Sequence, residues 1–124
     1  MTFERLGGAA FCYLTTTGRR SGRPHTVEMW FALHEVTLYC LAGGGEDADW
    51  VRNIHHDGAI GVRFNSRRAA GRGRVVRANT IEDELARRLL DEKYMDGAAG
   101  KRLSSWARTA LPVAIDLADP AAGD

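Results

Sequence analysis

The first third of the chain alternates hydrophobic and polar residues in a way that predicts two paired strands. Residues 10–17 combine aromatic, β-branched and apolar side chains and are followed by Gly18, which is typical of a strand that ends in a turn. Residues 25–33 alternate regularly, which predicts one continuous strand with a core face. The members of that face are Val27, Met29, Phe31 and Leu33.

Four segments further along the chain also show strand patterns. They span residues 36–42, 59–64, about 71–78 and 112–117. The first of them fits an antiparallel hairpin partner of residues 25–33. Its side chains on one face are Val36, Leu38 and Cys40. Three consecutive strands in this order predict a meander.

Three segments show helical spacing, and they lie after Gly45, within 80–94 and within 101–109. Asp47 or Asp49 can cap the first helix, and Thr80 with Asp83 resembles a capping box at the start of the second. Strands and helices do not alternate along the chain. Five or six strands with two or three helices therefore predict a mainly β (α+β) fold, a small Greek-key or meander barrel.

Composition limits the class of protein. The 124 residues fit one domain, predicted at residues 1–117, with a frayed tail at 118–124. No apolar run is long enough to cross a bilayer, and the start of the chain lacks the apolar segment of a secretory signal, so we expect a cytoplasmic protein. Cys12 and Cys40 lie in separate apolar runs without CxxC spacing, which predicts buried free thiols.

A basic turn between the first two predicted strands is the clearest candidate for chemistry. The turn reads GRRSGRPH from Gly18 to His25 and combines four potential cations, a hydroxyl and two glycines. Glycines let backbone N–H groups converge on an anion, Ser21 adds a donor, and guanidinium groups bind phosphate oxygens in pairs. The turn therefore predicts a phosphate site. An ordinary hairpin with solvated arginines fits the same residues equally well.

A glycine run and two tryptophans are further candidates for ligand contacts. The glycines 43–45 let the backbone approach a planar ligand closely, although a simple strand-to-helix turn also explains them. Trp30 lies opposite the core face of its strand, where it can stack on a cofactor ring or pack at a dimer interface. Trp50 is spaced with Ile54, which also favours a place in the core.

Other chemistries are not favoured. His55 and His56 are adjacent and no further ligand stands at zinc-like spacing, so no metal site is predicted. Ser21 does not stand in the GxSxG setting of a hydrolase nucleophile. The glycines at 71–73 precede strand residues instead of a helix, so they do not form a dinucleotide fingerprint.

Two long stretches of the sequence combine the basic turn with the glycine run and a following DWVRN motif. They read LTTTGRRSGRPHTVEMWFAL and LYCLAGGGEDADWVRNIHHDGAIGVRF, and weaker similarity continues through ARRLLDEKY and LPVAIDL. Together these stretches resemble the deazaflavin-dependent nitroreductase and quinone reductase family. The resemblance begins near Ala10 and covers most of the chain.

This resemblance implies a split β-barrel related to FMN-binding and pyridoxamine-phosphate-oxidase-like proteins, usually a homodimer with its cofactor in a groove near the subunit interface. It implies reduced coenzyme F-420 as hydride donor and a quinone, enone or nitro compound as acceptor. Many relatives carry Arg where this chain has His25. The predicted cofactor-binding residues are Arg19, Arg20, Ser21, Gly22, His25, Trp30, Gly43, Gly44, Gly45 and Trp50.

The sequence does not decide which group supplies the proton, and it is compatible with two functions other than an F-420-dependent reductase. Solvent, Tyr13, Tyr39 and Tyr94 are the candidate proton donors, and no catalytic side chain is predicted. An FMN-dependent reductase would share the fold and the phosphate turn. A binding module is the third possibility, in which the arginines within 63–77 contact nucleic-acid phosphates. Nucleic acid ranks last because acidic residues nearly balance the arginines.

Overall fold

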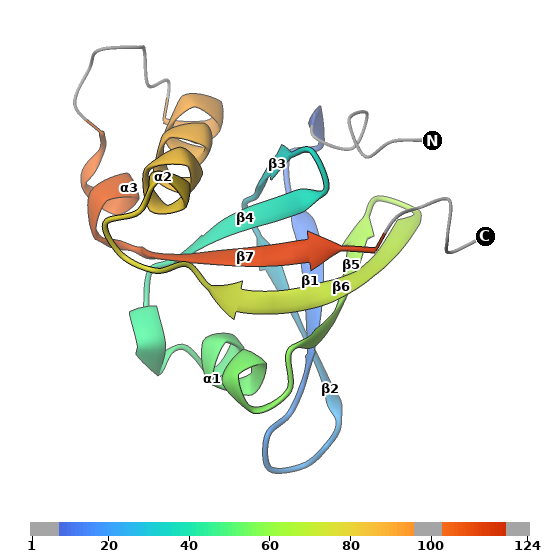
Figure 1. The fold of residues 1–124 in the computed structure, drawn as a ribbon. Helices are drawn as coiled ribbons and strands as arrows, with labels where there is room; N and C mark the ends of the chain where they lie inside the picture. Colours follow the sequence, from blue (N-terminus) through green and yellow to red (C-terminus); the bar gives the residue numbers. More distant parts are fainter. Residues whose placement is uncertain (1–7, 96–102, 119–124) are drawn as a thin grey trace.

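The computed structural model describes residues 8–95 and 103–118. Within these ranges, seven strands form one antiparallel sheet, and Figure 1 shows that this sheet is strongly curled. Hydrophobic side chains fill its interior. The order of strands across the sheet is β2-β1-β5-β6-β7-β4-β3. The strands are β1 (Cys12–Thr17), β2 (Pro24–Met29), β3 (Ala32–His34), β4 (Thr37–Ala42), β5 (Ala59–Phe64), β6 (Arg67–Val75) and β7 (Leu111–Leu117). The mainly β fold class is confirmed.

Helices close two sides of this sheet. The short 3-10 helix η2 (Gly45–Asp47) leads into α1 (Asp49–His56), and α2 (Ile81–Tyr94) and α3 (Ser105–Thr109) lie together at the other end of the molecule (Figure 1). The backbone N–H of Asp83 donates to Thr80 Oγ1 at 3.1 Å, which confirms the predicted cap of α2. None of the helices in the described ranges is long and apolar enough to cross a membrane.

The prediction of one continuous strand at 25–33 is wrong, and so is the meander. The chain leaves the sheet at Trp30 and Phe31, and the two pieces, β2 and β3, lie at opposite edges of the sheet. Phe31 is fully buried, and its N–H and C=O bond to the hydroxyl of Tyr94 at 3.1 and 3.0 Å instead of to a strand. The amine of Lys93 donates to the same carbonyl at 2.9 Å. The crossover is therefore held by α2.

Two boundary predictions also need correction. The strand predicted at 71–78 spans 67–75, because Asn65 adopts a left-handed conformation (φ 53°) and turns the chain earlier than expected. The third helix is shorter than 101–109, since α3 begins at Ser105; residues 101 and 102 lie outside the described part, as do residues 119–124 of the predicted tail.

The predicted caps of α1 and the predicted place of one valine are also wrong. Ala48 is the N-cap of α1 and forms no side-chain cap, because the carboxylates of Asp47 and Asp49 pair with arginines instead. Val36 is 49% exposed, since it lies in the turn before β4 instead of in the strand.

Hydrophobic side chains fill two regions, one on each side of β4 and β7. The curled sheet encloses the larger region, where Cys12 and Cys40 are fully buried and free, as predicted. Alternate residues of β4 and β7, including Tyr39 and Ala114, pack on the other side beneath α2 and α3. Because both faces of β4 and β7 are covered, these two strands form the centre of the fold.

Arg74 joins the sheet to the start of α2. Its guanidinium donates to the carboxylate of Glu82 at 2.6 and 2.8 Å and to that of Asp116 at 2.7 and 3.1 Å. The hydroxyls of Tyr39 and Thr37 donate to Glu82 and Asp116 at 2.8 and 3.2 Å. The hydrogen bonds from Arg74 hold the pKa of Glu82 and that of Asp116 below their ordinary values.

Acid is expected to weaken the fold through this network. Because the folded-state pKa of both carboxyls is lowered, their stabilising contribution is present above the ordinary carboxyl pKa and is lost as the pH falls through the lowered values. The urea midpoint of unfolding should therefore decrease from about pH 5 downward. In Arg74→Gln, the urea midpoint should decrease less steeply with falling pH than in the wild type. Equal slopes for the two proteins would contradict this role of Arg74.

Candidate functional site

The turn between β1 and β2 is held in a tight shape by its own backbone. Gly18 N–H donates to the carbonyl of Arg23 at 2.8 Å, and Gly22 N–H donates to the carbonyl of Gly18 at 2.9 Å. Ser21 Oγ accepts from Arg23 N–H at 3.1 Å. A Cβ on Gly18 would lie 2.6 Å from His25 Nε2, and Gly22 has φ +72°, so both positions favour glycine. The turn therefore brings Ser21 and His25 over Gly18.

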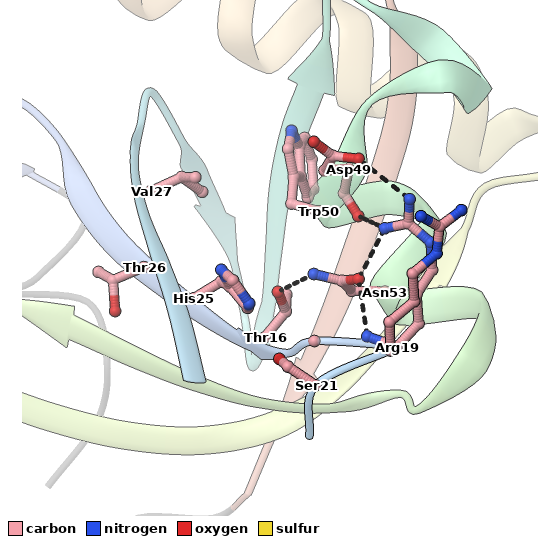
Figure 2. Close-up of a pocket in the computed structure, with 11 residues that line it drawn as sticks. Thr16, Arg19, Ser21, His25, Thr26, Val27, Asp49, Trp50 and Asn53 are labelled. Carbon is pink, nitrogen blue, oxygen red and sulfur yellow. Dashed lines mark hydrogen bonds and ion pairs between the residues drawn. The ribbon is translucent and has the colours of Figure 1, made fainter. Parts of the chain in front are cut away.

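Asn53 of α1 fastens this turn to the rest of the molecule (Figure 2). Its Oδ1 accepts from Arg19 N–H at 3.2 Å and from Arg19 Nη1 at 2.9 Å, and its Nδ2 donates to Thr16 Oγ1 at 3.1 Å. Arg19 Nη2 also pairs with Asp49 Oδ1 at 3.1 Å. Asn53 and Thr16 are only 4% and 1% exposed. The guanidinium of Arg19 is therefore largely committed to α1.

A pocket of about 480 Å³ opens between the turn, β2 and α1 (Figure 2). Arg20 and His25 bring potential positive charge to it, while the carboxylate of Asp49 is already paired with Arg19. Across the described residues, Arg20 makes no hydrogen bond or ion pair, so its guanidinium is available to a ligand. The lining residues are Thr16, Gly18, Arg19, Arg20, Ser21, His25, Thr26, Val27, Asp49, Trp50 and Asn53.

The structure brings together half of the predicted cofactor-binding residues. Arg19, Arg20, Ser21, His25 and Trp50 all line the pocket. Trp50 also packs against the main hydrophobic region, which confirms its expected place beside the core. The other half does not line the pocket: Gly22 shapes the turn from outside it, and the glycines 43–45 connect β4 to α1. For all ten residues, contact with a cofactor stays a prediction.

Trp30 lies in a different hollow, a groove of about 410 Å³. Its ring stacks on Tyr94 at 4.5 Å and 2°, and meets Trp106 edge-on at 5.5 Å and 90°. Trp30 is 47% exposed, which confirms that it leaves the core. Its contact with a cofactor ring stays a prediction. The residues around the groove are Glu28, Met29, Trp30, Leu41, Met95 and Trp106.

The three candidate tyrosine donors are engaged elsewhere. The hydroxyl of Tyr13 donates to Glu28 at 3.3 Å, that of Tyr39 to Glu82 at 2.8 Å, and that of Tyr94 to main-chain carbonyls. Burial, followed by the bond to Glu82, raises the pKa of Tyr39, and burial raises the pKa of Tyr94. None of the three lines the pocket at the turn.

Sequence reasoning missed Thr16, Asp49 and Asn53 as site residues. A signal for two of them was present, because Asp49 and Asn53 are four residues apart in DWVRN and share a helix face. That face points to the turn, as the two contacts with Arg19 show. The burial of Thr16 follows the alternation of Cys12 and Leu14 in β1, but no local pattern reveals its hydrogen bond with Asn53.

The family of the chain follows from its sequence as a whole. The model of the F420H(2)-dependent quinone reductase family matches residues 2–118. The chain belongs to this family. The prediction from the resemblance is therefore confirmed: the protein is a member of an oxidoreductase family that uses coenzyme F-420. No curated protein matches the chain.

Solved structures agree on the fold. A proposed pyridoxamine 5′-phosphate oxidase from Listeria innocua has a TM-score of 0.67 at 14% identity, with 94% of this chain and 90% of that chain covered. An F420 reductase has a TM-score of 0.64 at 19% identity, with 94% of this chain and 93% of that chain covered. A domain-swapped dimer has a TM-score of 0.65 at 19% identity, with 86% of this chain and 79% of that chain covered. The fold is thus the split β-barrel of FMN-binding proteins, as predicted.

Proposed function

We propose that this member of the F420H(2)-dependent quinone reductase family reduces a small, electron-poor acceptor such as a quinone, enone or nitro compound. Bound coenzyme F-420 would supply the hydride. The observation that supports a cofactor site at the turn is the pairing pattern of its two arginines. Arg19 is fixed to α1, whereas Arg20 lines the same pocket with its charge available.

The residues of the turn fit the phosphate-bearing tail of such a cofactor. Arg20 offers a guanidinium that can bind two phosphate oxygens, and Ser21 and His25 add polar groups beside it. Because Gly18 has no side chain, Ser21 and His25 can lie directly over it. Trp50 gives the pocket an aromatic wall. In this proposal, Arg19 acts through Asn53 as a positioning residue and keeps the turn open for the phosphate.

Residues farther along β2 would receive the reacting rings. The pocket at the turn includes His25, Thr26 and Val27, and the aromatic groove begins with the next residues of the strand, Glu28 and Met29. Trp30, stacked on Tyr94, offers a fixed, partly exposed indole to a planar ligand. This aromatic surface would orient ring and acceptor and limit the access of water. The glycines 43–45 are proposed to border the ring.

Solvent is the proposed proton source. The hydroxyls of Tyr13, Tyr39 and Tyr94 are each already donated to an oxygen of the protein. Hydride transfer to an acceptor such as a quinone can be completed by a proton from water, so the reaction needs no side-chain acid. The homodimer implied by the resemblance is also part of this proposal, and the domain-swapped dimer among the similar folds supports it.

A paired titration tests the proposal. The purified protein is titrated with F-420 and with FMN at one salt concentration, and ligand fluorescence is followed. We expect saturable binding with a preference for F-420, and oxidation of the reduced cofactor when a quinone is added. Selective FMN binding would transfer the function to a flavin reductase of the same fold. Absence of binding by both ligands would refute the cofactor site at the turn.

A further inference from the structure

A row of polar side chains crosses four neighbouring strands on the outer face of the sheet. In the registers of β2, β1, β5 and β6, Glu28 stands opposite Tyr13, Tyr13 opposite Arg63, and Arg63 opposite Arg68. Directly opposite residues in antiparallel strands project to the same side of a sheet. The two arginines at one end of the row are therefore immediate neighbours.

This arrangement places two like charges side by side without a compensating acid. The guanidinium of Arg63 is held 4.3 Å above the ring of Tyr13 and donates to the carbonyl of Asn65 at 2.7 Å. Arg68 forms no ion pair or hydrogen bond with the residues that the structure describes. The carboxylate of the row, Glu28, lies at the other end. Directly opposed like charges destabilise a strand pair, so the protein itself does not benefit from this pair.

Beside the arginines, the next row of the sheet is hollow. Thr26 stands opposite Thr15, with their hydroxyl oxygens 2.8 Å apart, and Thr15 stands opposite Gly61, which has no side chain. The result is a cavity of about 480 Å³. Its lining residues are Tyr13, Thr15, Thr26, Gly61, Val62, Arg63, Arg68 and Ala69. No Asp or Glu of the described chain lines it.

We propose that this cavity binds a small anion through carboxylate or phosphate oxygens. The two guanidinium groups would hold the oxygens from one side. Because the hydroxyls of Thr15 and Thr26 share one hydrogen bond, the hydroxyl proton that is not used in that bond would be donated to the anion from the other side. Arg63 is already oriented by Tyr13, so little side-chain entropy is lost on binding. Such an anion would also relieve the repulsion between Arg63 and Arg68. The site does not depend on the proposed reductase function.

The test compares the whole wild-type protein with Arg68→Gln, using citrate and inorganic phosphate as probes in calorimetric titrations at constant ionic strength. Arg72→Gln is the matched control, because Arg72 lies on the same face of β6 outside the cavity. We expect saturable binding in the wild type and in Arg72→Gln, and a loss of about tenfold or more in Arg68→Gln. Equal affinity in all three proteins, or no saturable binding in the wild type, would overturn the proposal.

A stability measurement separates a binding role from a structural one. Without an anion, Arg68→Gln removes the repulsion and should unfold at the same or a higher temperature than the wild type. A lower unfolding temperature with unchanged citrate affinity would show that Arg68 serves the fold, and would refute the site.

A competition experiment between citrate and F-420 identifies the source of the anion. Thr26 lines both this cavity and the pocket at the turn, so the anion is either a free molecule or an acidic group of the cofactor bound there. Citrate that binds equally well with F-420 present would indicate a separate small molecule. Citrate displaced by F-420, with weaker F-420 binding in Arg68→Gln, would indicate the cofactor. Both results retain the anion site.

Discussion

Replacement of Asn53 by alanine is expected to lower both the free energy of unfolding and the affinity for the cofactor. The side chain is 4% exposed and links Arg19, at 3.2 and 2.9 Å, to Thr16, at 3.1 Å. Without it, the buried hydroxyl of Thr16 and the backbone N–H of Arg19 lose their partner. Leaving such groups unsatisfied costs roughly 1 to 3 kcal/mol. Urea unfolding and F-420 titration on the same samples measure the two effects.

Two variants separate the contact of Asn53 with the turn from its contact with Thr16 of β1. Thr16→Val removes the hydroxyl partner of Asn53 but keeps both contacts with Arg19, so it should cost stability while retaining most of the affinity. Asn53→Asp keeps an acceptor for Arg19 and should bind better than Asn53→Ala. If all three variants bound F-420 as tightly as the wild type, Asn53 would have no part in shaping the phosphate site.

Local patterns predicted most strands because successive side chains of a strand point to opposite faces of the sheet, so buried and exposed residues alternate along the sequence. The same alternation caused the error at residues 25–33, where Val27, Met29 and Leu33 all pack against the hydrophobic interior although the chain leaves the sheet between β2 and β3. The cause of the break is Tyr94, which lies 63 residues away and binds the backbone of Phe31. A contact at that separation leaves no trace in periodicity.

In the candidate site, too, residue types were predictable from the sequence, whereas contacts between distant residues were not. The residue types of the turn predicted an anion site. The structure has a pocket there, with Arg20, Ser21 and His25 among its lining residues, and the binding of an anion stays a prediction. The different roles of Arg19 and Arg20 were not predictable, because adjacent arginines look equivalent in a sequence. Their difference arises from the bond of Arg19 to Asn53, which is 34 residues distant. Side-chain partners in three dimensions, and not residue type, decide which cation remains available.

Arg20, whose guanidinium is available to a ligand, gives the most specific prediction for cofactor binding. Arg20→Gln should weaken F-420 binding by roughly 10- to 150-fold, the equivalent of the 1.5 to 3 kcal/mol that a hydrogen bond to a charged group contributes. The free energy of unfolding should not change, because Arg20 is exposed and forms no hydrogen bond or ion pair with other described residues. Arg19→Gln should instead lower stability and affinity together, since it loses its bonds to Asn53 and Asp49.

Arg23→Gln is the matched control for this prediction, because Arg23 is exposed in the same turn but does not line the pocket. FMN and riboflavin, which differ by one phosphate, provide a second comparison. If Arg20 binds phosphate, Arg20→Gln should reduce the affinity for FMN and leave that for riboflavin unchanged, and Arg23→Gln should change neither. Equal losses in the two variants would mean that the net charge of the turn attracts the ligand. Arg20 would then have no specific contact with phosphate.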